Sequence, residues 1–563
     1  MGSTDLSGRV VLRRSIKGQR RDVVVGSLLG AGHQAGEALV PVLIGLVIDH
    51  GVADGDGAGL LLGLGALAVV YIGLSFSFRF GARAGERAAE TAAHRLRTEL
   101  IGRLLAPEGG ADSGRLPGEL TNIATQDAKR VGAVNMAVIV GIAALTGLLV
   151  SAVVLLRISP ALGLVVLLGT PLLLWLGHLL SKPLERRSEA EQDRAAHASG
   201  IASDLVAGLR VLKGVGAESA AVARYRGTSR DSLSATLRAA RAQAWQNGIV
   251  LTLTGAFIAL VALVGGRLAT QGDISLGQLI SAVGLALFLL GPLSEFSWVN
   301  AELAQGRASA GRIAEVLAAD RAVLPGTGTP RRPVEGGVRL RQVSYGTLRD
   351  IDLDIAPGDI VGVVTTDPAD ATALLRCLGR HEDPGSGTVE LDGVALATLD
   401  PADIRAEILV AEHDADLFEG TLAANVSAAA PGADIGPALA ASGADDVART
   451  LPRGRDTELT ERGRSLSGGQ RQRVALARAL AADTPVLVVH DPATAVDAVT
   501  EARIATGIRD IRRGRTTIMV TTSPALLAVA DRVVLIEDGR VTGTAAHAEL
   551  VRDRLSYRTA VLS

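Results

Sequence analysis

Long apolar segments dominate the first half of the chain. Six of them reach the length that a helix needs to cross a lipid bilayer, about 20 residues, and their number and length argue against buried helices of a soluble domain. The pattern predicts an α-helical domain with six membrane spans, at residues 23–47, 58–80, 133–156, 161–181, 247–269 and 276–299.

The connections between the predicted spans alternate between short and long. The long ones, at 81–132 and 182–246, are rich in Ala, Arg and Glu and carry most of the basic residues of this half. By the positive-inside tendency they face the cytoplasm together with both termini. Helical hairpins of about 25 residues per arm would project about 38 Å, at a rise of about 1.5 Å per residue.

Composition and charge narrow the possible functions. The chain has 563 residues, is 48% hydrophobic and carries a net charge of only -2, which argues against nucleic acid as a partner. Its single cysteine, Cys377, excludes an internal disulfide and is interpreted as a small buried hydrophobic residue. The basic N-terminal run LSGRVVLRRSIKGQRRD lacks the apolar core of a signal peptide and is interpreted as an interfacial helix.

The pattern changes in the second half. A helix end and a Pro/Gly-rich linker at 306–335 separate the predicted membrane domain, residues 1–305, from a C-terminal domain, residues 336–563. Strand-like runs there alternate with helix-like runs, which predicts an α/β domain with substantial parallel sheet. The strand-like runs are VRLRQVSY, IDLDIA, DIVGVV, PVLVVH, TTIMVTT and RVVLIEDGRV.

The C-terminal domain contains the run LSGGQRQR at residues 466–473, followed by the helical run VALARAL. The small residues Ser467, Gly468 and Gly469 allow the backbone to approach a phosphate, and the helix N-terminus behind them favours negative charge. An apolar strand and the segment DPATAVDAVTE follow.

Six spans, two long arms, a linker and this order of motifs resemble the ABC exporter half-transporters over essentially the whole chain. The resemblance implies a six-span domain with cytoplasmic helical extensions, followed by an α/β P-loop-type ATP-binding-cassette domain. In this family ATP and Mg²⁺ lie between two such domains, one supplying the P-loop and catalytic groups and the other supplying LSGGQ. The arm tips, near 118–127 and 205–216, are expected to act as coupling helices.

The segment VTTDPADATALLRCLGR stands where the family has its P-loop. The alignment places Asp370 at the last Gly, Ala371 at the Lys and Thr372 at the Mg²⁺-binding hydroxyl of G-x-x-x-x-G-K-[ST]. No lysine follows Lys213, so no shift of the alignment restores the missing charge. Asp367 and Asp370 are expected to face phosphate with like charge, leaving weak binding through amides at a helix that begins near Thr372.

Other positions depart from the family's pattern as well. An imidazole is a poor Mg²⁺ ligand, and an Asp in place of the catalytic Glu is one methylene short. The matched positions are His490 for the Walker B Asp, Asp491 for the catalytic Glu, His413 for the Q-loop Gln, Thr522 for the switch His, Tyr345 as the one adenine-stacking candidate and Asp497 for the D-loop.

These departures lead to the interpretation that the chain is the degenerate subunit of a heterodimeric exporter in a bacterial plasma membrane, with its ATP-binding domain in the cytoplasm. It is expected to donate Ser467, Gly468, Gly469 and Gln470 to ATP held by a partner with intact Walker motifs, while its own site does not hydrolyse ATP. The alternative is a regulator or gated pore without turnover. The cargo, a small molecule, peptide or lipid, is not identified by the sequence.

Two ionisable residues of the first span are candidates for contact with substrate. His33 and Glu37 lie four residues apart, hence on one helix face. An interhelical hydrogen bond is the favoured interpretation, with a substrate or proton role as the alternative. Glu295, Asn300 and Glu302 are expected at the membrane interface or in the cytoplasmic extension.

Overall fold

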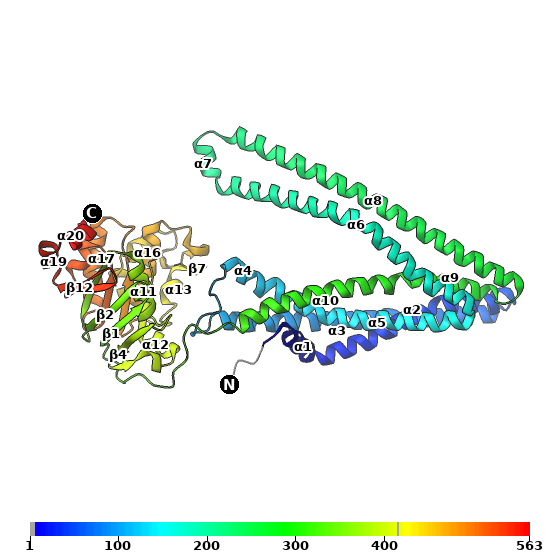
Figure 1. Ribbon diagram of the computed structural model, residues 1–563, viewed down its shortest axis with the longest axis horizontal. Helices are drawn as coiled ribbons and strands as arrows, with labels where there is room; N and C mark the ends of the chain where they lie inside the picture. Colours follow the sequence, from blue (N-terminus) through cyan, green and yellow to red (C-terminus); the bar gives the residue numbers. More distant parts are fainter. Residues whose placement is uncertain (1–5, 414–415, 563) are drawn as a thin grey trace. The chain divides into compact units, whose positions relative to one another are not determined.

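The computed structural model describes residues 6–413 and 416–562. It divides the chain into two compact units (Figure 1). The first combines residues up to 101 with 115–318, and the second combines 102–114 with the chain from 319 onward.

The first unit is helical. Its long helices are continuous where the sequence runs on without Gly/Pro clusters, and they break at polar turns. Its helices are α1 (Gly8–Gly18), α2 (Arg20–Val47), α3 (Gly57–Leu104), α4 (Pro117–Asn122), α5 (Ala128–Ile158), α6 (Pro160–Ala207), α7 (Leu209–Gly214), α8 (Glu218–Gln271), α9 (Leu276–Phe288) and α10 (Leu290–Leu317), with π-helical segments at Ile48–Ala53 and Ile123–Asp127.

The predicted membrane spans all fall within these helices. Five helical stretches of the described chain are long and apolar enough to cross a membrane, and the predicted span at 161–181 lies in α6, whose described apolar part is Pro160–Leu176. The five stretches are Arg20–Ala53, Gly57–Leu104, Pro117–Ile158, Glu218–Gln271 and Leu276–Leu317.

The long polar connections are extensions of the spanning helices. α6 and α8 pack along each other, and α7 lies at the tip of the pair (Figure 1). The segments expected near 118–127 and 205–216 contain the short helices α4 and α7. α10 continues to Leu317, past the predicted domain boundary at residue 305.

An ion pair between a buried carboxylate and a partly exposed arginine fixes α10 to the base of α5. The Asp127 carboxylate is fully buried and accepts from Arg312 Nε at 2.8 Å and Nη2 at 2.6 Å, and from Ser309 Oγ at 2.8 Å. This two-pronged geometry holds both helices in one register.

The second unit is built on two sheets and a helical lobe. A six-stranded, mainly parallel sheet has the order β12-β11-β3-β10-β9-β6, and an antiparallel sheet has the order β2-β1-β4-β5. The strands are β1 (Val338–Tyr345), β2 (Leu348–Ile355), β3 (Ile360–Thr365), β4 (Ser386–Leu391), β5 (Val394–Ala395), β6 (Ile408–Ala411), β9 (Val486–His490), β10 (Thr516–Val520), β11 (Arg532–Glu537) and β12 (Arg540–Ala545), with a small pair β7 (Gly420–Thr421) and β8 (Glu458–Leu459).

Helices cover the parallel sheet and complete two apolar cores. One core joins both sheets with α11, and the other joins the sheet to the helical lobe around α16. The helices are α11 (Pro368–Leu378), α12 (Pro401–Glu407), α13 (Leu422–Ser427), α14 (Gly436–Ala441), α15 (Ala444–Thr450), α16 (Gly468–Ala481), α17 (Ala498–Ile511), α18 (Pro524–Ala528), α19 (His547–Asp553) and α20 (Leu555–Leu562).

Cys377 lies within the first of these cores, on α11. It is buried, and this burial raises the pKa of its thiol to about 12. The thiol therefore stays protonated, in agreement with its interpretation as a small buried hydrophobic residue.

Arg512, after α17, is buried and donates to the carbonyls of Thr484 at 2.7 Å and Thr516 at 2.8 Å. Arg512→Met leaves those carbonyls unsatisfied, at a cost of about 3 kcal/mol. We expect the thermal unfolding midpoint of the purified chain to fall by about 6–12 °C. Arg512→Lys keeps the charge but not the forked guanidinium, so its unfolding midpoint should lie between those of the wild type and the Met variant. A fall of less than about 2 °C for the Met variant contradicts this structural role.

Candidate functional site

Polar residues meet at the carboxyl edge of the parallel sheet, where ligands bind in α/β folds. Thr365 ends β3, His490 ends β9, and Thr522 follows β10. A cavity of about 660 Å³ opens there, and α20 of the C-terminus lines its other side. Its lining residues are Thr365, Thr366, Pro368, Ala371, His490, Asp491, Val520, Thr521, Thr522, Leu555, Ser556, Thr559 and Ala560.

The connection from β3 to α11, where the resemblance placed the P-loop, is a short turn. Only Thr366 and Asp367 separate the strand from the helix, which begins at Pro368. Asp367 is the N-cap, and its carboxylate accepts from the amide of Ala369 at 2.8 Å. The prediction that the helix begins near Thr372 is therefore wrong, because an Asp followed by Pro starts a helix early.

The two residues on this helix predicted to meet phosphate and metal point elsewhere. Asp370 is 1% exposed, and its Oδ2 accepts from the amide of Gly539 at 3.2 Å, so it does not face the cavity as expected. Its Oδ1 is buried without a hydrogen-bond partner in the described chain. The Thr372 hydroxyl donates to the Pro368 carbonyl at 3.1 Å, one turn back along the helix.

The positions matched to the Walker B, catalytic and Q-loop residues do come together. His490 Nε2 is 3.9 Å from Asp491 Oδ2, and His413 Nδ1 is 3.3 Å from the Asp491 carbonyl oxygen. The two imidazole rings are 6.0 Å apart, edge to face. Asp491 has a φ of 44°, in the left-handed region that Asp adopts more readily than most residues with a side chain. Within the described residues, no cluster of three His, Cys, Asp or Glu side chains is arranged to hold a metal ion.

Tyr345, the adenine-stacking candidate, is the last residue of β1. Its hydroxyl lies 3.5 Å from Nη1 of Arg376 on α11, which donates to it. This contact raises the pKa of the Arg376 guanidinium further, so the side chain remains a cation.

The signature segment, by contrast, forms a well-defined helix start. Ser467 caps α16: its hydroxyl accepts from the Gln470 amide at 3.3 Å, and the Gln470 side chain accepts from the Ser467 amide at 2.8 Å. Ser467 and Gly468 are exposed, whereas Gly469 is buried. A Cβ at Gly469 would lie 2.4 Å from the Ala495 carbonyl oxygen, so this position requires glycine.

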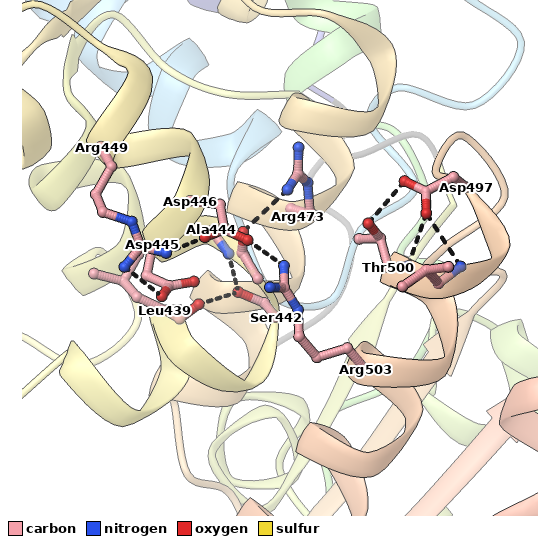
Figure 2. A network of polar contacts seen from close by, with 12 residues as sticks. Leu439, Ser442, Ala444, Asp445, Asp446, Arg449, Arg473, Asp497, Thr500 and Arg503 are labelled. Carbon is pink, nitrogen blue, oxygen red and sulfur yellow. Dashed lines mark hydrogen bonds and ion pairs between the residues drawn. The ribbon is translucent and has the colours of Figure 1, made fainter.

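A polar network supports the signature helix from behind (Figure 2). Arg473 of α16 donates to the carbonyls of Gly469 and Gly443, both at 3.2 Å. Asp446 of α15 pairs with Arg449 and with Arg503 of α17. The hydrogen bond from Arg503 keeps the pKa of the Asp446 carboxyl below its usual range. The network therefore ties three helices together at neutral pH.

The D-loop position belongs to the same assembly. Asp497 caps α17, accepting from the amides of Val499 and Thr500 and from the Thr500 hydroxyl (Figure 2). These hydrogen bonds, the Thr500 amide first, lower the pKa of its carboxyl. Gln472 of α16 accepts from the Ala495 amide at 2.9 Å and so links the signature helix to the segment before Asp497.

The cavity beside the signature and the cavity at α11 differ in the charge of their lining residues. A cavity of about 580 Å³ beside Gly468 is lined by Arg462, Arg464 and Arg471, with Asp416 as its acidic residue. The described lining of the cavity at α11 contains no Lys or Arg. The positive charge of the described residues therefore favours an anion beside the signature rather than in the cavity at α11.

In the first unit, the candidates His33 and Glu37 line a cavity of about 630 Å³ between α2, α3 and α9. His33 Nδ1 is 3.1 Å from the Leu74 carbonyl oxygen of α3, the interhelical hydrogen bond favoured from the sequence. Its Nε2 is 3.7 Å from Glu37. Glu295 accepts from Gln34 of α2 at 3.2 and 3.3 Å, so it faces the middle of the first span and not the predicted interface.

Two family models match the chain, one in the helical unit and the other in the α/β unit that follows it. The model described as ABC transporter transmembrane region matches residues 23–293, and the model described as ABC transporter matches residues 348–494. The chain belongs to the ABC transporter family. Its architecture is that of an exporter half-transporter, a membrane-spanning domain fused to the ATPase domain that drives transport.

Two curated relatives of this ABC transporter chain have the same sequence identity to it. An ATP-dependent lipid A-core flippase of Thiobacillus denitrificans is 29% identical over 406 residues, which is 70% of both chains. A multidrug efflux ATP-binding/permease protein of Mycobacterium tuberculosis is 29% identical over 532 residues, 93% of this chain but 44% of the relative. The chain thus spans less than half the length of that relative.

A solved structure shares the fold of the whole chain. It is entitled a bacterial Atm1-family ABC exporter with ATP bound, and it matches with a TM-score of 0.73 at 23% identity over 98% of each chain.

Some residues of the site were not found from the sequence. Gln472 and Arg473 are the last two residues of the run LSGGQRQR and lie on α16, so their position near the site could have been predicted from the sequence. Asp446 and Arg503 lie far apart in the sequence and carry no motif.

Proposed function

We propose that this ABC transporter chain is the non-hydrolysing subunit of a heterodimeric, ATP-driven exporter. In this proposal Ser467, Gly468, Gly469 and Gln470 contact ATP held by the P-loop of a different subunit, whose Glu catalyses hydrolysis with Mg²⁺. One contrast carries the proposal: the α16 N-terminus presents an exposed serine and glycine beside three arginines, whereas the α11 N-terminus is capped by the carboxylate of Asp367.

The residue types at the positions of the metal ligand and the catalytic base support the proposal that this site has lost its catalytic role. His490 and Asp491 stand at the metal and base positions, but an imidazole is a poor ligand for Mg²⁺, which prefers oxygen. The length of the Mycobacterium tuberculosis relative also supports pairing, because a second copy of this architecture would fit in its unmatched part. We place the pair in a bacterial plasma membrane, with a small molecule, peptide or lipid as cargo that contacts the cavity at His33 and Glu37.

Co-purification tests this function. When the chain is tagged and co-expressed with a half-transporter that has intact Walker motifs, we expect one-to-one recovery and ATPase activity in the pair. The chain alone should show less than about 1% of that activity, because its P-loop lysine is absent. Robust turnover by the chain alone contradicts the proposal, and an inactive pair favours a regulator or gated pore.

A further inference from the structure

The residues around α11 do not fit the ATP that the family implies. We propose that the site formed by α11 and β9 of this chain holds no ATP at any stage, so that the heterodimer closes on a single nucleotide. This inference rests on the proposed function, because it concerns the second site of the same pair. The inference goes beyond the proposed function, because a site that does not hydrolyse ATP could still bind it.

Residues 366 and 368–370, at the start of α11, offer no free backbone amide to a phosphate. A P-loop needs N–H groups at the helix start that point at the ligand. Pro368 has no N–H, the Ala369 amide donates to the Asp367 carboxylate, and the Asp370 amide donates to the Asp367 carbonyl at 3.1 Å. The Thr366 amide donates to the Ile536 carbonyl at 3.2 Å.

The same four residues occur again in the chain as an ordinary helix start. The sequence DPAD at residues 400–403 begins α12, and there Asp400 accepts from the Ala402 amide at 2.8 Å. Asp367 accepts from the Ala369 amide at the same distance. The segment that replaces the P-loop therefore has the sequence and the geometry of a self-capped helix, which supplies its own anion.

Charge opposes the nucleotide as well. The Asp367 carboxylate is exposed at the start of α11, between Thr366 and Pro368 of the cavity lining, and Asp491 also lines this cavity. Like charges at short range repel strongly where water is partly excluded. A volume of about 660 Å³ is ample for a nucleotide, so chemistry and not space excludes it.

Equilibrium binding to the full-length chain tests the inference. The chain alone, in lipid nanodiscs with Mg²⁺ and radiolabelled ATP, is expected to bind at least about a hundredfold more weakly than the intact partner, since several charge-assisted hydrogen bonds are missing. Trapping ATP in the pair with a partner Glu→Gln variant should then give one nucleotide per pair. Two nucleotides per pair, or comparable affinities, overturn the inference.

Restoring the second glycine and the lysine of the motif gives a positive test. Asp367→Gly, Asp370→Gly and Ala371→Lys together remove the cap and return the lysine at a residue that lines the cavity. We expect at least about tenfold tighter ATP binding by the chain alone. Asp400→Gly is the matched control, because it removes the same kind of cap from α12 and should leave ATP binding unchanged.

The outcomes separate the two proposals. If the wild-type chain binds ATP but does not hydrolyse it, the inference fails and the proposed function stands. If the chain hydrolyses ATP, both fail. If the restored variant is poorly folded, the nucleotide count of the wild-type pair still decides.

Discussion

Gly468→Asp is expected to lower the ATPase turnover of the pair at least about a hundredfold, which corresponds to about 2.7 kcal/mol in the activation barrier. Gly468 is exposed at the start of α16, where the proposed ATP of the partner lies. A carboxylate there opposes the phosphates and removes the favourable contact of the helix N-terminus, and contacts of this kind are worth several kcal/mol in a transition state. Steady-state ATPase of the purified pair measures the effect.

The local geometry makes this variant interpretable. A Cβ at Gly468 has the Ala495 Cβ as its nearest neighbour, at 3.7 Å, which is an ordinary contact. The Asp side chain is therefore expected to leave the fold of this chain intact. Gly468→Asn, of the same size but uncharged, separates bulk from charge and should retain more turnover. Near-normal activity of the Asp variant means that this signature is not part of the working site.

The fold was largely predictable because it depends on patterns that are regular along the chain. Apolar segments of spanning length became helices, and the strand-like runs from 338 to 541 became β1, β2, β3, β9, β10, β11 and β12. β4 and β6 were missed, as were the two-residue strands β5, β7 and β8. β4 (Ser386–Leu391) begins with exposed residues, and β6 (Ile408–Ala411) is too short to show a period.

The candidate site was predictable in part, for a physical reason. His490 and Asp491 lie at the carboxyl end of β9, a predicted strand, where ligands bind in α/β folds. His413 follows β6, which was not predicted, and it was reached only through the resemblance to the family's Q-loop. The start of α11 was misplaced because the family's pattern was given more weight than the local one. Asp followed by Pro is itself a helix-start signal, and its second occurrence at Asp400 was available in the sequence.

The support behind the signature was beyond prediction. Arg473 donates to the carbonyl of Gly443, thirty residues before it, and Arg503 pairs with Asp446. Such contacts depend on how α15, α16 and α17 pack, and no spacing rule within one element specifies them. The same holds for Asp370, whose burial against Gly539 depends on the turn between β11 and β12.

Asp491→Asn is expected to leave the steady-state ATPase of the pair within a few-fold of wild type, whereas replacing the partner's catalytic Glu by Gln should abolish turnover. A carboxylate acts as a base only where a metal-held phosphate and an in-line water are both in place. In the proposed assignment Ala371 stands at the position of the lysine and His490 at that of the metal ligand, so the means of holding them are missing around Asp491. The left-handed Asp491 backbone is held by its amide, which donates to the Val520 carbonyl at 3.0 Å. The Asn variant is close to isosteric, so this backbone arrangement should persist. The asymmetry between the two variants is therefore the signature of a single working site. A hundredfold fall in turnover for Asp491→Asn would mean that this site performs chemistry.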